Sequence, residues 1–205
     1  MPIRSLIPAC DIELDRFEEL VSAIHGMPQV GAFKIGAALG LSHGLPKVVA
    51  TARRYTDKPL IYDHQKAGTD IPDTAPAFME TLANSGIDAV ILFPFTGPVT
   101  QSSWTQAAIE SGLDVIVGAH MTHQGFLATD NGYITTDATE RIYASAALAG
   151  VTHFVVPGNQ PDVIRRVRDV VSEEQDDPVF YAPGFIAQGG SVSEAASAAG
   201  TRWHA

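Results

Sequence analysis

The chain has 205 residues, of which 45% are hydrophobic and 18% charged, the balance of a globular protein long enough to bury one sizeable core. Its formal net charge of -10 at pH 7 argues against nucleic acid or an anionic membrane as a partner. The single cysteine, Cys10, excludes an internal disulfide, and no apolar run approaches the ~20 residues of a membrane span. The amino terminus does not have the pattern of a signal peptide, so the sequence predicts a cytoplasmic protein.

In chain order, short apolar segments with strand character alternate with longer segments of helical periodicity. The predicted strands cover residues 5–11, 29–36, 59–65, 89–95, 114–120, 152–158 and 179–184. The predicted helices cover residues 14–25, 38–54, 74–85, 99–111, 137–149, 161–174 and 192–199. Strands that are apolar throughout and separated by helices are typical of a parallel sheet covered by helices.

These βα units follow one another without a linker, which predicts one domain over residues 1–205. We expect an α/β fold of the (β/α)₈ TIM-barrel type, with a doubly wound open sheet as the alternative. Residues 201–205 resemble the start of an eighth strand, and the sequence stops there. The eighth strand and last helix are therefore expected to be cut short.

Polar side chains gather where the predicted strands end, and in α/β folds that end binds ligands. Asp11 closes the first strand, Lys34 lies near the end of the second, and the third runs into Asp63, Lys66 and Asp70. A lysine between carboxylates stays protonated, and a carboxylate held against a substrate carboxylate would repel it. A solvated ion pair on a loop is the alternative, and Asp70 could also cap the helix that follows. Two of the four lysines fall at the ends of buried strands, which favours function.

Five short motifs resemble, in order, those of the orotidine 5'-phosphate decarboxylases, a cofactorless barrel family. They are Pro8-Ala9-Cys10-Asp11, Phe33-Lys34-Ile35-Gly36, residues 63–70, Met121-Thr122-His123-Gln124-Gly125 and residues 183–190. The fourth is similar to the family's Met-Ser-His-Pro-Gly, with threonine for serine and glutamine for proline. Related sugar-phosphate lyases share the third-strand acids and lysine, but they carry an acid in place of Lys34 and lack the Met-Thr-His type of motif.

The resemblance implies removal of carbon dioxide from carbon 6 of orotidine 5'-monophosphate, giving uridine 5'-monophosphate, without cofactor or metal. Lys66 would stabilise the carbanion and protonate it, while Asp63, fixed by Lys34, would stress the departing carboxylate. The expected substrate contacts are Asp11 at the ribose hydroxyls, Thr122 at the pyrimidine edge, and Gln188, Gly189 and Gly190 at the phosphate. Ile71, Thr74 and Pro183, the first residue of the phosphate-loop motif, are further expected substrate-binding residues. The resemblance also implies a homodimer in which Asp70 and Ile71 cross to the partner's active site.

The third-strand motif departs from the family pattern. The family has Asp-x-Lys-x-x-Asp, whereas here each gap in Asp63-x-x-Lys66-x-x-x-Asp70 is one residue longer. Because strand side chains alternate faces, this spacing predicts a bulge or early turn near residues 65–67 that returns Lys66 to the side of Asp63. Aligning on the lysine would instead place His64 where the acid belongs.

A second departure concerns the phosphate site. The family's phosphate-binding arginine lies in a Gly-Arg pair that closes strand eight, and Arg202 comes too early to match it. His120 and His123 have no third metal ligand in their stretch, so structural or substrate-edge roles are favoured over a metal site.

Three functions stay open from the sequence. The first is the decarboxylase, which would release carbon dioxide from orotidylate without metal. The second is a related barrel lyase or aldolase that acts on a sugar phosphate with a divalent metal. The third is a catalytically impaired homologue that binds a nucleotide without turnover.

Overall fold

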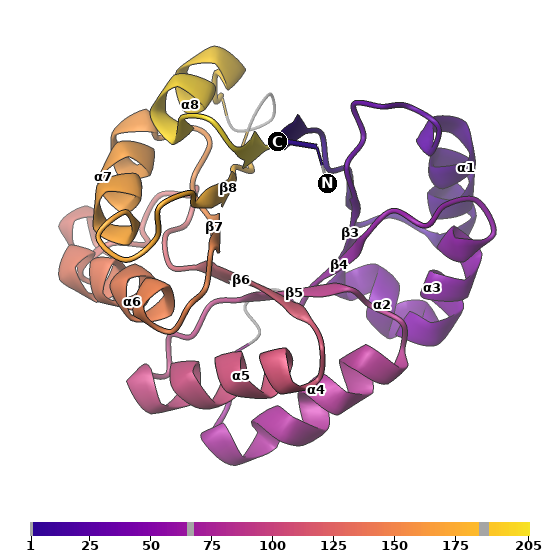
Figure 1. Cartoon of the computed structure of the whole chain (residues 1–205), viewed down its shortest axis with the longest axis horizontal. Helices are drawn as coiled ribbons and strands as arrows, with labels where there is room; N and C mark the ends of the chain where they lie inside the picture. The colour runs from indigo at the N-terminus through magenta and orange to yellow at the C-terminus, as the bar shows by residue number, and fades with distance from the viewer. Residues whose placement is uncertain (1, 65–67, 185–188) are drawn as a thin grey trace.

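The computed structural model describes residues 2–64, 68–184 and 189–205, and its strands form a ring with helices on the outside (Figure 1). All neighbouring strands in the sheet are parallel. Their order is β1 (Arg4–Ser5), β9 (Trp203–His204), β8 (Val179–Tyr181), β7 (His153–Val155), β6 (Asp114–Gly118), β5 (Ala89–Leu92), β4 (Leu60–Asp63), β3 (Phe33–Gly36) and β2 (Ala9–Cys10).

The ring closes because β1 and β2 are two halves of one segment, separated only by residues 6–8. β1 pairs with β9 and β2 pairs with β3, and the Ile7 amide donates to the Ala205 carbonyl at 2.6 Å. The predicted barrel is therefore confirmed, and the open doubly wound sheet is wrong. The eighth strand, expected to be cut short, is the two-residue β9, which pairs with a neighbour on each side.

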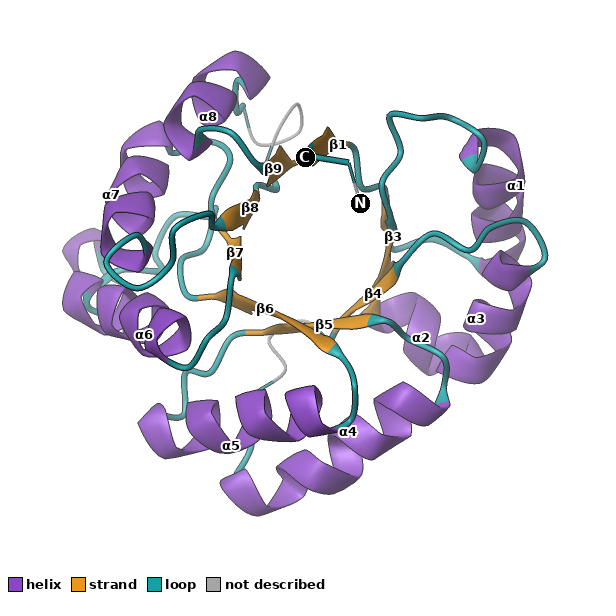
Figure 2. Ribbon diagram, in the orientation of Figure 1, coloured by secondary structure: helices purple, strands orange, loops and turns teal. Residues whose placement is uncertain are grey.

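Helices follow the strands and cover the outside of the ring (Figure 2). They are α1 (Leu14–Ile24), α2 (Ala37–His43), α3 (Leu45–Arg53), α4 (Ala75–Asn84), α5 (Pro98–Glu110), α6 (Thr136–Leu148), α7 (Pro161–Val171) and α8 (Val192–Ala199), with short 3₁₀ turns η1 (Pro72–Thr74) and η2 (Ala128–Asp130). Within the described ranges, no helix is both long and apolar enough to cross a membrane.

The single helix predicted over residues 38–54 is wrong, because the chain forms α2 and α3 with a break at Gly44. Gly44 has a φ of 78°, which glycine adopts without a steric penalty, and Pro46 lies in the first turn of α3. The glycine ends one helix and the proline favours the start of the next.

The strand side chains divide into two apolar layers. Alternate residues point outward and pack under the helices, as Leu60 and Tyr62 of β4 do. The residues between them point into the barrel, where a second buried cluster consists of Ala32, Ile61, Ala89, Ile91, Phe93, Ile116, Val155, Val179 and Tyr181. Because Asp63 is two residues after Ile61, the same alternation places its carboxylate on the inner side of the barrel.

Candidate active site

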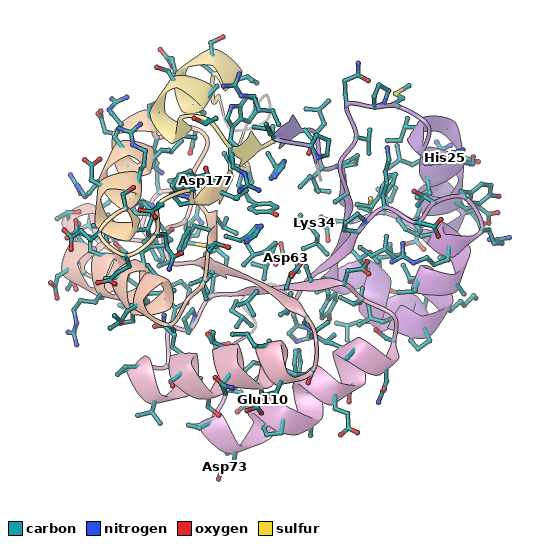
Figure 3. All side chains as sticks on the ribbon, viewed as in Figure 1. His25, Lys34, Asp63, Asp73, Glu110 and Asp177 are labelled. Carbon is teal, nitrogen blue, oxygen red and sulfur yellow. The ribbon has the colours of Figure 1, made fainter. Side chains whose placement is uncertain are left out.

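A lysine and an aspartate from neighbouring strands meet inside the mouth of the barrel. Lys34 of β3 lies opposite Ile61 in the sheet register, and its long side chain reaches along β4 to Asp63. Lys34 Nζ donates to Asp63 Oδ2 at 2.7 Å, with side chains only 21% and 10% exposed. Figure 3 labels both residues near the centre of the ring. The expected contact between Lys34 and Asp63 is present, while their chemical roles stay predictions.

Asp11 follows β2 and lies against the end of β3. A Cβ atom added to Gly36 would come within 1.5 Å of Asp11 Oδ1, so only glycine leaves room for this carboxylate. Asp11 is exposed to solvent, and its contact with the ribose stays a prediction. Its neighbour Cys10 points outward into the core, where burial raises the pKa of the thiol to about 12. Cys10 is thus a core residue, as the sequence indicates.

A cavity of about 480 Å³ extends from the Lys34–Asp63 pair into the barrel. Its wall includes two other predicted site residues, Thr122 after β6 and Pro183 after β8. The remaining lining is mostly apolar, with Ile91, Phe93 and Tyr181 among the inward side chains. An apolar cavity with a few convergent polar groups at its mouth is the usual form of a small-molecule site.

The segment after β6 is fixed by side chains from other elements. The Tyr143 hydroxyl accepts from the His120 amide at 3.2 Å and donates to the Val155 carbonyl at 2.7 Å. Asn159 and Gln160 donate to the carbonyls of Thr122 and Met121, each at 3.2 Å. These contacts hold the cavity wall that carries Thr122.

His120 is buried in that wall and faces the cavity. Desolvation lowers its pKa, so the ring is neutral at pH 7, and its Nδ1 lies 3.0 Å from the Met121 carbonyl oxygen. Phe126 packs on it at 5.7 Å between ring centroids. A structural or substrate-edge role fits these surroundings. Among the residues that the structure describes, no three His, Cys, Asp or Glu side chains are grouped so that they could hold a metal ion.

The predicted phosphate loop follows β8. The Gly190 amide donates to the Gly184 carbonyl at 3.1 Å, and a Cβ atom on Gly190 would come within 2.9 Å of the Gly158 carbonyl oxygen. The loop therefore depends on glycine for its close backbone packing. Gln188 lies outside the described residues. Gly189 and Gly190 do not line the cavity of about 480 Å³, and their phosphate contacts stay predictions.

The segment after β4 carries the other predicted residues. Lys66, and with it the bulge expected near residues 65–67, lies outside the described residues. Asp70 was expected as a possible helix cap, but η1 begins after Ile71, and Asp70 Oδ1 instead accepts from the Ile71 amide at 2.7 Å. Asp70, Ile71 and Thr74 do not line their own chain's cavity, and Ile71 is 58% exposed.

The structure adds inward side chains that the sequence analysis did not assign to the site. Phe93, Tyr181 and His204 line the cavity. The alternation of side chains along a strand could have indicated them. Phe93 and Tyr181 each lie two residues after another inward residue, and His204 lies opposite Tyr181 in the sheet. His123 also lines the cavity, whereas the sequence left it between a structural and a substrate-edge role.

The fold and the site together define a (β/α)₈ barrel with a buried lysine–aspartate pair at its carboxyl-end mouth, the position where barrel enzymes bind their substrates. Residues 4–199 match the model of the Orotidine 5'-phosphate decarboxylase / HUMPS family. The chain belongs to this family.

Curated relatives and solved structures agree with this assignment. The orotidine 5'-phosphate decarboxylase of Methanosarcina mazei is 32% identical over 198 residues, which are 97% of this chain and 83% of the relative. That of Methanococcoides burtonii is 31% identical over 97% of this chain and 85% of its own. The decarboxylase from Methanocaldococcus jannaschii complexed with inhibitor BMP has a similar structure, with a TM-score of 0.83 at 21% identity, covering 98% and 87% of the two chains.

Proposed function

We propose that this protein decarboxylates orotidine 5'-monophosphate to uridine 5'-monophosphate, a reaction of pyrimidine biosynthesis, in the cytoplasm. The Lys34–Asp63 pair is the observation that carries the proposal, because it places a buried carboxylate at the mouth of the cavity. The related sugar-phosphate lyases have an acid in place of Lys34, and two acids there could not form this pair.

The chemistry follows from where charge disappears and where it develops. The substrate carboxylate loses its charge as carbon dioxide leaves, so repulsion from Asp63 is relieved in the transition state. The electron pair left on carbon 6 would be stabilised by the ammonium group of Lys66, which then delivers its proton to that carbon. Lys34 holds the Asp63 carboxylate in place, because its Nζ donates to Asp63 Oδ2 at 2.7 Å.

Binding energy from the remote parts of the nucleotide supports this step. Asp11 accepts hydrogen bonds from the ribose hydroxyls, and Thr122 contacts the pyrimidine edge. Gln188 and the amides of Gly189 and Gly190 hold the phosphate, in a glycine-rich turn that leads to the amino end of α8 (Val192–Ala199). Energy from these contacts is used to hold the reacting carboxylate against Asp63.

The test is release of carbon dioxide from orotidylate by the purified chain in the presence of a metal chelator. We expect turnover in the wild type and almost none in Lys66→Ala, with uridylate affinity largely retained, because the lysine acts mainly in the transition state. Activity only with magnesium on a ketose phosphate would select the lyase instead. Nucleotide binding without turnover would select the impaired homologue.

We also propose a homodimer with shared active sites. Asp70, Ile71 and Thr74 lie away from their own cavity, and the exposed side chain of Ile71 is available to a partner. In a twofold dimer this segment would complete the other subunit's pocket. The alternative is that the segment serves only its own subunit.

Complementation separates these alternatives. Lys66→Ala and Asp70→Ala should each be nearly inactive, yet a mixed dimer contains one site with both residues intact. Random reassociation makes about half of the dimers mixed, so roughly a quarter of wild-type activity should return after the two variants are refolded together. Stable mixed dimers without recovery would contradict the shared site.

A further inference from the structure

We propose that His64, together with Tyr62, is a positioning residue that fixes the end of β4 so that Asp63 faces the cavity. The proposal rests on the decarboxylase function proposed above. His64 follows Asp63 directly and belongs to the stretch in which this chain departs from the family spacing.

Two outward side chains contact each other on either side of Asp63. Tyr62 and His64 flank Asp63, and the Tyr62 hydroxyl is hydrogen-bonded to His64 Nδ1. Their ring centroids are 5.4 Å apart, and Tyr62 is only 4% exposed. Because strand side chains alternate, holding residues 62 and 64 outward holds residue 63 inward.

A chain of aromatic side chains anchors His64 in the helix layer. Its ring meets the edge of Phe78 of α4 at 5.4 Å between centroids, and Phe78 packs on Trp104 of α5 at 4.8 Å. Trp104 Nε1 donates to the Ile71 carbonyl at 3.1 Å. The same aromatic chain therefore holds the residue after Asp63 and the residue after Asp70.

His64 lies directly after β4, which ends at Asp63, so its side chain acts on the backbone next to the proposed reacting group. A reacting group must be held within about 0.5 Å of its working position, and an error of about 1 Å can cost about 100-fold in rate. The His64 side chain restrains the backbone directly after Asp63 through its contacts with Tyr62 and Phe78.

The test removes the hydrogen bond while keeping the ring. His64→Phe and Tyr62→Phe should each lower kcat roughly tenfold or more and leave the uridylate Kd within about twofold. The double variant should be no slower than the slower single variant, because both changes remove the same bond. His64→Asn, whose amide oxygen can replace Nδ1 as acceptor, should recover part of kcat.

His25→Phe is the matched control. His25 also lies beside a tyrosine, with its ring centroid 6.3 Å from that of Tyr55, but it lies in the outer helix layer far from Asp63 (Figure 3). The kcat of the His25→Phe variant should equal that of the wild type.

Folded His64→Phe and Tyr62→Phe proteins with kcat within twofold of the wild type would overturn the proposal. If His64→Phe does not fold, the Tyr62→Phe result decides alone. Crystal structures give a readout that does not depend on activity: the Lys34–Asp63 distance should lengthen beyond 3.5 Å in the variants, and an unchanged distance would also overturn the proposal. An inactive wild type would contradict the proposed decarboxylase function instead.

Discussion

Acidification should destabilise the barrel through His204, on the strand that closes the ring. His204 is 3% exposed, its Nδ1 lies 2.8 Å from Ser5 Oγ of β1, and its ring packs on Tyr181 at 4.9 Å between centroids. Burial lowers its pKa to about 4, and the neighbouring His153 and Arg202 act in the same direction. Protonation of the His204 imidazole is therefore less favourable in the folded state than in the unfolded state.

The sign follows from the two pKa values. An unfolded histidine has a pKa of about 6.5, so between about pH 6.5 and pH 4 the unfolded chain binds a proton that the folded chain does not. The contribution of neutral His204 to the free energy of unfolding is fully present above about pH 6.5 and is lost as the pH drops toward about 4. The loss between pH 7 and pH 5 is about 2 kcal/mol from His204 alone. Burial also lowers the pKa of His153, which adds a loss in the same direction.

The assay is urea denaturation of the wild type and His204→Gln at pH 7 and pH 5. Glutamine does not titrate, so the variant should lose about 2 kcal/mol less than the wild type over this interval, with similar denaturant slopes. Equal losses in wild type and His204→Gln would refute the reasoning.

Three further results are expected. Lys34→Met should lower the free energy of unfolding by about 3 kcal/mol in urea titrations at pH 7, since it leaves the Asp63 carboxylate buried without its lysine. Lys34→Met combined with Asp63→Leu should recover most of that loss. Cys10 should react with a thiol reagent at pH 8 at least 100-fold faster in denaturant than in the native state, because it is fully buried with a raised pKa. Tyr143→Phe should lower the free energy of unfolding by about 1–3 kcal/mol in urea titrations, because it removes the acceptor of the buried His120 amide.

The order of strands and helices could be predicted because each buried strand is a short apolar run between amphipathic segments. The break at Gly44 was missed because residues 38–54 keep a helical pattern across it. The predicted strands were also too long, as for residues 29–36, where β3 contains only Phe33–Gly36. Ladder hydrogen bonds decide where a strand begins, and they depend on neighbours that a single sequence does not reveal.

The Lys34–Asp63 pair was predictable in part. The inward direction of each side chain follows from alternation along its own strand. The register between β3 and β4 does not follow from either strand alone, because it depends on the stagger between them. That stagger pairs Gly36 with Asp63 and leaves Lys34 opposite Ile61. The length of the lysine side chain covers this offset.

The surroundings of residues 68–74 could not be predicted, because they are set by contacts across the fold. Thr96 donates to the Gly68 and Asp70 carbonyls at 3.3 Å, and Ser103 donates to the Pro72 carbonyl at 2.9 Å. A local pattern suggested a side-chain cap, whereas these partners come from β5–α5 and α5. Tertiary hydrogen bonds therefore replaced the local cap.

Lys34 alone does not give the cavity the net positive charge that would attract an anion. Among the cavity-lining residues in the described part of the chain, Lys34 is the one lysine or arginine, and Asp63 balances it at 2.7 Å. The pair presents little net charge to an anionic nucleotide, so attraction must come from elsewhere. The amides of Gly189 and Gly190 and the ammonium group of Lys66 are the groups that the proposed function assigns to this task. In the proposed function, Lys34 serves to hold the Asp63 carboxylate beside the substrate carboxylate, so that the two groups repel each other until carbon dioxide leaves.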